Sequence, residues 1–157
     1  MLERTLVLLK PDAVQRGLVG EIISRFERKG LKLAGLKLRQ FPTKLIQEHY
    51  AAHKDRPFYP KLVKFMTSGP VVAMVLEGKD AIEVTRSLMG ATNSRKAAAG
   101  TIRGDLGMSF SNNLVHGSDS PEAAKKELAL FFGDAAEVVE WEPAELEWVY
   151  SVEEELS

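Results

Sequence analysis

The amino-acid sequence predicts an α+β fold, an α/β sandwich in which helices pack against one side of a four-stranded sheet. Two features lead to this prediction. Apolar runs of strand length alternate with segments whose apolar residues recur at helical spacing, in the order βα, β, αα, βα, loop, βα. This order also contains two βαβ-like halves, which favours the ferredoxin-like βαββαβ arrangement.

The beginning of the chain is expected to supply a central strand and the first helix. Residues 4–10 form an apolar run that ends at Pro11, which is typical of a buried strand, and Lys10 lies at the C-terminal end of that run. Apolar side chains then recur at helical spacing over residues 18–29, and Gly30 suits the C-terminal cap of this helix.

The next segment is expected to form a strand and two short helices. Residues 31–41 alternate in the manner of a strand, and the alternation slips at Ala34, which favours a bulge. Thr43 is a suitable cap for a helix that runs to about His53. A second short helix is predicted over residues 58–66.

The second half of the chain completes the predicted sheet. Residues 71–76 are continuously apolar, as in a strand buried on both faces, and a helix follows over residues 80–89. Residues 90–112 show no clear period, and a stretch of that length is usually functional or mobile. A fourth strand over residues 113–116 precedes a helix that begins with Ser120 as its cap and proline at the first helical position.

Length and composition limit the classes of protein. The chain is expected to form a single domain over residues 1–157, with an acidic C-terminal extension from about residue 151. Cysteine is absent, which excludes disulfides, thiolate catalysis and cysteine-ligated zinc. The N-terminus has no secretory signal pattern and no apolar run approaches a membrane span, so we expect a cytoplasmic protein without a membrane partner.

Charge is unevenly distributed along the chain. Residues 84–104 carry four basic side chains and no acidic one, which suits an anionic ligand. Residues 127–157 carry ten acidic side chains and no basic one, which we interpret as a solvated or interface-forming tail. Trp141, Trp148 and Tyr150 make this tail aromatic enough to dock on the rest of the protein.

A phosphate-like anion is the ligand that the basic residues fit best. Arg86, Thr92 and Arg103 bracket the glycine-containing loop, and guanidinium groups bind phosphate oxygens in a bidentate fork. An ordinary basic loop remains an alternative, as does a solvated strand-end role for Lys10. The glycine-rich motifs of P-loop and dinucleotide-binding proteins are absent.

His116 is the candidate nucleophile. A glycine follows it and allows a ligand to approach closely, and Glu127 lies two turns into the next predicted helix, from where it could reach back to the ring. A packed structural histidine is the alternative. His49 and His53 have a spacing that can bind metal, but they lack a third ligand, so we interpret them as surface residues.

Short segments distributed along the chain match a known pattern. They are Thr5–Asp12, Arg16–Glu21, His49–Tyr50, Asp55–Phe58, Ser68–Val75, Gly90–Asn93, Gly100–Asp105 and Asn113–Ser120. In this order the chain resembles the nucleoside diphosphate kinase family over nearly its whole length.

The resemblance implies a ferredoxin-like fold with an antiparallel sheet and added helices. It also implies transfer of the γ-phosphate of a nucleoside triphosphate, typically ATP, to a nucleoside diphosphate by a ping-pong mechanism. By the match His116 is the nucleophile and becomes a phosphohistidine, while Glu127 and Ser118 orient the ring and steady the transferring oxygens. The residues expected to contact phosphates or ribose are Lys10, Tyr50, Arg86, Thr92, Arg103 and Asn113.

The resemblance further implies a base slot, a metal ion and an assembly. Phe58 would stack on the base and Leu62 would help to line the slot, although such residues are more often part of a core. Magnesium would arrive with the nucleotide phosphates, without a dedicated protein metal site. The family forms tetramers and hexamers, and we favour a hexamer for this chain. Ser94 and Ala99 stand where the family often has prolines, so the loop is expected to be less rigid.

Two other functions stay open at this point. The first is a catalytically silent nucleotide-binding member on the same fold, which intact His116, Lys10 and Arg103 argue against. The second is an RNA-binding ferredoxin-like module. The aromatic strand of such modules is missing and the net charge is −1, so no nucleic-acid partner is expected.

Overall fold

Four strands form one antiparallel sheet in the computed structural model, which describes residues 2–151 and 153–154. The strands are β1 (Glu3–Leu9), β2 (Lys32–Arg39), β3 (Val71–Gly78) and β4 (Val115–Gly117). They lie in the order β2-β3-β1-β4, with β1 and β3 at the centre. The predicted α+β class and ferredoxin-like sheet are therefore confirmed.

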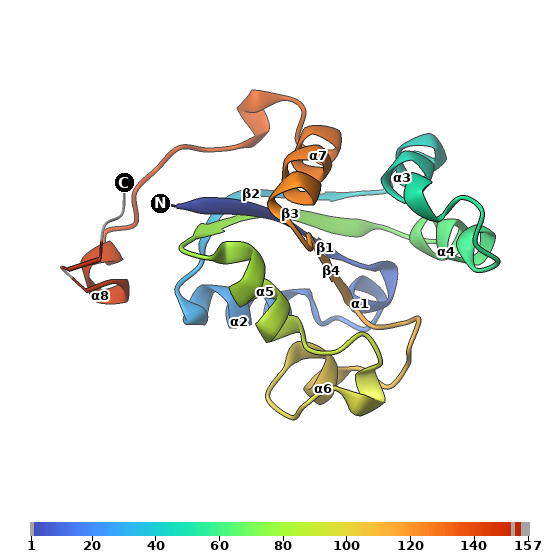
Figure 1. Cartoon of the computed structure of the whole chain (residues 1–157), viewed down its shortest axis with the longest axis horizontal. Coiled ribbons are helices and arrows are strands. Elements are labelled where there is room, and N and C mark those ends of the chain that lie inside the picture. Colours follow the sequence, from blue (N-terminus) through green and yellow to red (C-terminus); the bar gives the residue numbers. More distant parts are fainter. Residues whose placement is uncertain (1, 152, 155–157) are drawn as a thin grey trace.

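Helices cover both faces of this sheet, so the expectation of helices on one side alone was wrong (Figure 1). The first face packs on α2 (Val19–Lys29), α5 (Ala81–Met89) and α6 (Ile102–Leu106). The second face packs on α3 (Thr43–His49), α4 (Tyr59–Met66) and α7 (Pro121–Phe131). Alternation along β1 divides its side chains between the two cores, and every residue of β3 is buried.

The structure adds one helix that the sequence did not predict and corrects the cap of another. Pro11 not only ends the first strand segment but is also the first residue of a short helix, α1 (Pro11–Gln15), because proline fits the first helical position. Thr43 begins α3 without capping it, since Pro42 occupies the cap position. The predicted C-cap at Gly30 is confirmed with φ 104°, and the predicted bulge lies between Leu33 and Gly35.

The segment between α5 and β4 contains more regular structure than its sequence indicates. It includes the 3₁₀ turn η2 (Ser94–Lys96) and helix α6, which Thr101 caps by accepting a hydrogen bond from the Gly104 amide at 3.0 Å. Arg25 of α2 joins this segment to the body of the fold, with Nη1 2.7 Å from Asp105 Oδ2. The segment is therefore anchored to α2, and the lower rigidity expected from Ser94 and Ala99 stays a prediction.

The C-terminal segment returns along the sheet through η3 (Ala135–Glu137) and ends near α8 (Leu146–Val149). Trp141 docks as predicted, donating from Nε1 to the Leu33 carbonyl at 2.9 Å, and the Tyr150 hydroxyl accepts from the Lys79 amide at 3.0 Å. Trp148 is 84% exposed, so the expectation that it docks was wrong. The predicted extension from about residue 151 lies mostly outside the described residues.

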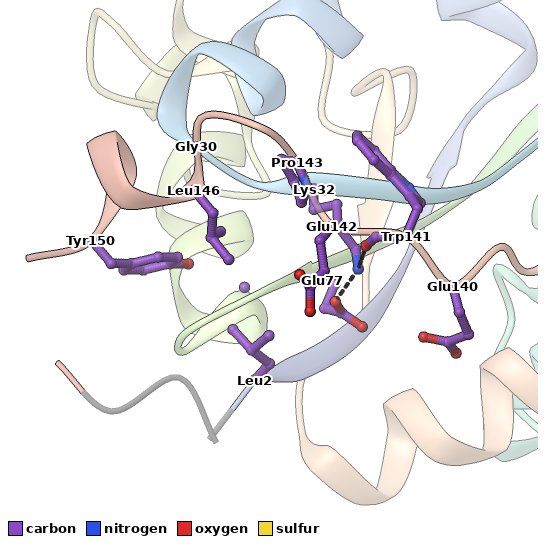
Figure 2. Close-up of a pocket in the computed structure, with 11 residues that line it drawn as sticks. Leu2, Gly30, Lys32, Glu77, Glu140, Trp141, Glu142, Pro143, Leu146 and Tyr150 are labelled. Atoms are coloured by element: carbon purple, nitrogen blue, oxygen red, sulfur yellow. Dashed lines mark hydrogen bonds and ion pairs between the residues drawn. The ribbon is translucent and has the colours of Figure 1, made fainter. Parts of the chain in front are cut away.

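A cavity of about 710 Å³ lies between this segment and the start of β2 (Figure 2). Two of its three carboxylates are paired, because Lys32 Nζ lies 2.5 Å from Glu77 Oε1 and Arg4, outside the lining, bridges Glu77 and Glu140. The cavity is larger than the one that adjoins His116, but its lining contains no histidine among the described residues and is negatively charged.

Membrane insertion through a helix has no support in the described part of the chain. None of its helices combines the length and the apolar character that a bilayer crossing requires.

Candidate active site

His116 lies on β4, a short edge strand that pairs only with β1 among the described strands. Its side chain is 22% exposed and lines a cavity of about 510 Å³. The ring nitrogen Nε2 lies 2.9 Å from Glu127 Oε1. No hydrogen bond of the described residues involves Nδ1. The histidine therefore has one nitrogen held by a carboxylate and the other available to a ligand.

Glu127 is positioned by the start of α7. Ser120 caps that helix by accepting a hydrogen bond from the Ala123 amide at 3.0 Å, as predicted, and Glu127 follows two turns later. Burial opposes ionisation of Glu127, but hydrogen bonds from His116 and Ser118 outweigh it and lower the pKa of the carboxyl group. Glu127 therefore stays negatively charged beside the imidazole near neutral pH.

Ser118 acts on the carboxylate and not on the cavity. Its hydroxyl is fully buried and donates to Glu127 Oε2 at 2.5 Å, while its oxygen lies 3.4 Å from the Leu6 amide. Ser118 is absent from the cavity lining. The hydrogen bond to Glu127 supports the expectation that Ser118 orients the ring, and its role on the transferring oxygens stays a prediction.

A tight turn at Leu114 connects the loop to β4. Leu114 has φ 73°, which is unusual for a residue with a bulky side chain, and the Val115 amide donates to the Asn113 carbonyl at 2.8 Å. Asp12 accepts from the Leu114 amide at 3.1 Å, and the Lys10 amide donates to the Leu114 carbonyl at 2.8 Å. These bonds fix the chain on both sides of the turn and set the direction in which β4 leaves it.

Lys10 and Asn113 form the floor of the site. Lys10 Nζ donates to Asn113 Oδ1 at 2.8 Å, and Asn113 Nδ2 donates to the carbonyls of Thr92 and Phe110. Burial and the nearby Arg103 guanidinium lower the pKa of Lys10 to about 8. A buried ammonium with so few partners is a ready site for an anion.

Arg103 is buried and already holds three backbone carbonyls. Nε donates to Asn113 at 3.1 Å, Nη1 to Gly90 at 3.0 Å and Nη2 to Val115 at 2.6 Å. Burial and the positive charge of Arg86 lower the pKa of Arg103 to about 10. A guanidinium has five N–H groups, so two remain for a ligand.

Arg86 and Thr92 complete the rim of the cavity. Both side chains are exposed, and Arg86 Nη1 donates to the Gly117 carbonyl at 3.3 Å. Together with Lys10 and Arg103 they surround the open face of His116. The predicted anion-binding residues are thus brought together at one cavity.

His49 is buried beside His116, so its interpretation as a surface residue was wrong. Its side chain is 1% exposed, and its ring packs edge-on against that of His116 with centroids 4.8 Å apart. Burial and His116 lower the pKa of His49 to about 3, so the ring is neutral. His53 is exposed, as expected. The i, i+4 spacing did not reveal that one histidine is buried and the other exposed. It assumes one continuous helix, whereas α3 ends at His49.

The remaining predicted substrate-contact residues are less closely assembled. Tyr50 lines the cavity, and burial raises the pKa of its hydroxyl, which has no hydrogen-bond partner in the described residues. Phe58 is 49% exposed at the start of α4, and Leu62 packs against the second core. Neither lines the cavity, so stacking by Phe58 stays a prediction.

Fold and site together define a class of protein: one whose basic cavity can hold an anionic group beside a histidine. The model of the family described as nucleoside diphosphate kinase matches residues 3–137. The chain belongs to this family, and it is a phosphotransferase.

Relatives and solved structures agree with this assignment. The chain is 55% identical to the nucleoside diphosphate kinase of Archaeoglobus fulgidus and 56% identical to that of a Synechococcus species, covering 98% and 99% of those proteins and 95% of itself in each case. The structure of the halophilic nucleoside diphosphate kinase from Halobacterium salinarum, in complex with CDP, is similar at a TM-score of 0.92 and 53% identity. That match covers 96% of this chain and 99% of the other.

Proposed function

We propose that this chain transfers the γ-phosphate of a nucleoside triphosphate, typically ATP, to a nucleoside diphosphate through a phosphohistidine at His116. The observation that carries the proposal is the different environment of the two ring nitrogens. Nε2 is hydrogen-bonded to Glu127, whereas Nδ1 has no hydrogen-bond partner among the described residues and His116 lines the cavity. A ping-pong reaction needs such a carrier, because the two nucleotides use the cavity in turn.

The first half-reaction begins with the lone pair of His116 Nδ1. It attacks the γ-phosphorus, the bond between that phosphorus and the β,γ-bridging oxygen breaks, and the electron pair leaves on the β-phosphate of the departing diphosphate. The ring becomes positively charged, and Glu127 stabilises it by accepting the Nε2 proton in a hydrogen bond. The second half-reaction reverses these steps with a different diphosphate.

Positive charge at the cavity would neutralise the phosphates. Lys10, Arg86 and Arg103 supply three cationic groups on three elements or their ends, and phosphoryl transfer depends mainly on such positioning and neutralisation. Thr92, Asn113 and Tyr50 would add contacts to phosphate or ribose, and Phe58 and Leu62 would meet the base. Stacking tolerates any base, so broad nucleotide use is expected.

Magnesium would be held mainly by the nucleotide. Two carboxylates line the cavity, and Glu127 already accepts hydrogen bonds on both of its oxygens. Asp119 is exposed and takes part in no hydrogen bond among the described residues, so its carboxylate is free to meet a phosphate-bound ion. Bound there, the ion would neutralise charge that develops on the phosphate oxygens.

We also propose that the protein works as a homo-oligomer in the cytoplasm, with a hexamer favoured over a tetramer. Apolar side chains that an assembly could cover support this. Leu36 and Leu38 on β2 are 52% and 60% exposed, and Met108 and Phe110 on the loop before β4 are 75% and 59% exposed. Light scattering of the purified protein would give the subunit number directly.

Intact-mass measurement after incubation with magnesium and ATP tests the mechanism. We expect one acid-labile phosphoryl adduct on the wild-type protein and on His53→Asn, and none on His116→Ala. Subsequent addition of CDP should remove the adduct and yield CTP. An unmodified wild-type protein, or an adduct that survives in His116→Ala, would contradict the proposal.

A further inference from the structure

Both ring nitrogens of His49 are buried without a hydrogen-bond partner in the described part of the chain. The phosphoryl-transfer steps make no use of this imidazole. Leaving buried polar atoms unpaired costs free energy, because they lose their hydrogen bonds to water on folding and gain none in return. Such a group in a folded protein calls for an explanation, and a bound ion is one that would satisfy it.

His49 faces two other potential metal ligands. Its Nδ1 lies 3.7 Å from Glu127 Oε1, and the same oxygen lies 2.9 Å from His116 Nε2. One ligand atom from each of the three residues falls within 4.8 Å of the others. Zinc bonds of about 2.0–2.1 Å at tetrahedral angles place ligand atoms roughly 3.3 Å apart. Two of the separations, 2.9 and 3.7 Å, lie on either side of that value and the third is within 4.8 Å, so side-chain rotations would bring the three atoms onto one ion.

The donor set selects the kind of ion. Neutral imidazole is the form that binds metals. Two imidazole nitrogens and one carboxylate suit zinc and neighbouring transition metals, whereas magnesium prefers oxygen ligands throughout. All three residues line the same cavity, so a water or phosphate oxygen could supply a fourth ligand.

We propose that His49, His116 and Glu127 form a binding site for a divalent transition-metal ion of the zinc class, separate from the magnesium that accompanies the nucleotide. The ion replaces the proton between His116 Nε2 and Glu127 Oε1. It withdraws electron density from the ring and removes the carboxylate that stabilises the phosphohistidine. An ion of this class is thus an inhibitor that acts at the nucleophile itself.

The positive side chains nearby weaken the affinity of the site for a metal ion. Lys10 and Lys126 both act electrostatically on His49, and they disfavour an additional cation. Phosphorylation of His116 also leaves the ring less able to donate to a metal. The ion should therefore bind the unphosphorylated protein better than the phosphohistidine form.

Cobalt titration of the untagged protein, without nucleotide, tests the site directly. Cobalt(II) reports its coordination through visible absorption, and zinc should displace it. We expect one ion per chain for the wild type and for His53→Asn, the matched exposed histidine. His49→Asn should weaken binding at least tenfold, the order expected for loss of metal-site interactions. Glu127→Gln, which keeps the side-chain shape, should weaken it as well.

Three outcomes would overturn the proposal: no stoichiometric binding to the wild type, equal binding by His49→Asn, or equal weakening by His53→Asn. Circular dichroism establishes that each variant is folded, and Glu127→Gln decides the matter should His49→Asn fail to fold. Because binding is read from absorption and not from activity, the result stands apart from whether His116 carries phosphate.

Discussion

Replacing Arg103 by alanine tests whether this buried arginine holds the loop and β4 together. From sequence alone, Arg103→Ala is expected to reduce phosphoryl transfer far more than stability. The structure changes that expectation, because the side chain donates to the backbone carbonyls of Gly90, Asn113 and Val115. Alanine would leave all three carbonyls without this donor.

The size of the stability loss follows from those three bonds. A hydrogen bond from a charged donor contributes about 1.5–3 kcal/mol, and water entering from the adjacent cavity favours the low end of that range. Three bonds at about 1.5 kcal/mol each give an expected loss of about 4.5 kcal/mol, which is a large part of the roughly 5–15 kcal/mol that stabilises an ordinary domain. Nucleotide binding should fall as well, since the two remaining N–H groups of Arg103 disappear.

Urea unfolding at pH 7, followed by circular dichroism, measures this loss. Arg103→Lys is the matched control, because it keeps the charge but reaches fewer carbonyls, so it should fall between the wild type and Arg103→Ala. An Arg103→Ala protein less than about 1 kcal/mol below the wild type would refute the structural role. Equal stability of Arg103→Lys and the wild type would show that the positive charge, and not the number of hydrogen-bond donors, matters.

Three further changes have defined outcomes. Glu127→Gln should slow phosphorylation of His116 about 10- to 100-fold in rapid-quench assays; an unchanged rate would remove Glu127 from the mechanism. His49 has a pKa of about 3 when folded and about 6.5 when unfolded, so the unfolded chain binds more protons between these values. Stability should fall as pH drops through this window, by up to about 1.4 kcal/mol per pH unit, and His49→Asn should flatten the slope measured by urea titrations. Arg25→Ala should speed hydrogen exchange of the amides at 100–105 roughly tenfold, whereas the exposed Arg28→Ala should leave them unchanged; equal exchange in both would refute the anchoring role.

Local sequence signals predict most of the fold. The strands follow from short apolar runs. The cap at Ser120 follows from its hydroxyl group, and the helix end at Gly30 follows from the ease with which glycine adopts a positive φ. The coverage of both sheet faces departs from the prediction, although the continuous apolar character of residues 71–76 already indicates a strand without a solvated side. The sequence marks Pro11 only as a terminator, because Lys10 before it is not a capping residue, whereas Ser120 caps the helix that begins at Pro121.

The site is predicted less completely because its contacts are long-range. The spacing of His49 and His53 suggests a shared face on one continuous helix, but α3 ends at His49 and a 3₁₀ turn follows, so the two side chains diverge. The carbonyl partners of Arg103 come from two segments, Gly90 after α5 and Asn113 and Val115 at the start of β4, and periodicity carries no information about such contacts. The carboxylate of Glu127 could be anticipated because helix geometry alone carries it back toward β4.

Glu127 points toward His116 only because of its position around the axis of α7. Each residue of an α-helix turns the side chain by about 100°. Ser120 sets where the helix starts, and Ser118 and His116 then share the two oxygens of the carboxylate. Inserting a single alanine between the cap and Glu127 would leave every catalytic side chain in the sequence yet aim the carboxylate at a different part of the protein. The number of residues from the cap to the glutamate is therefore as much a part of the enzyme's chemistry as the residues themselves.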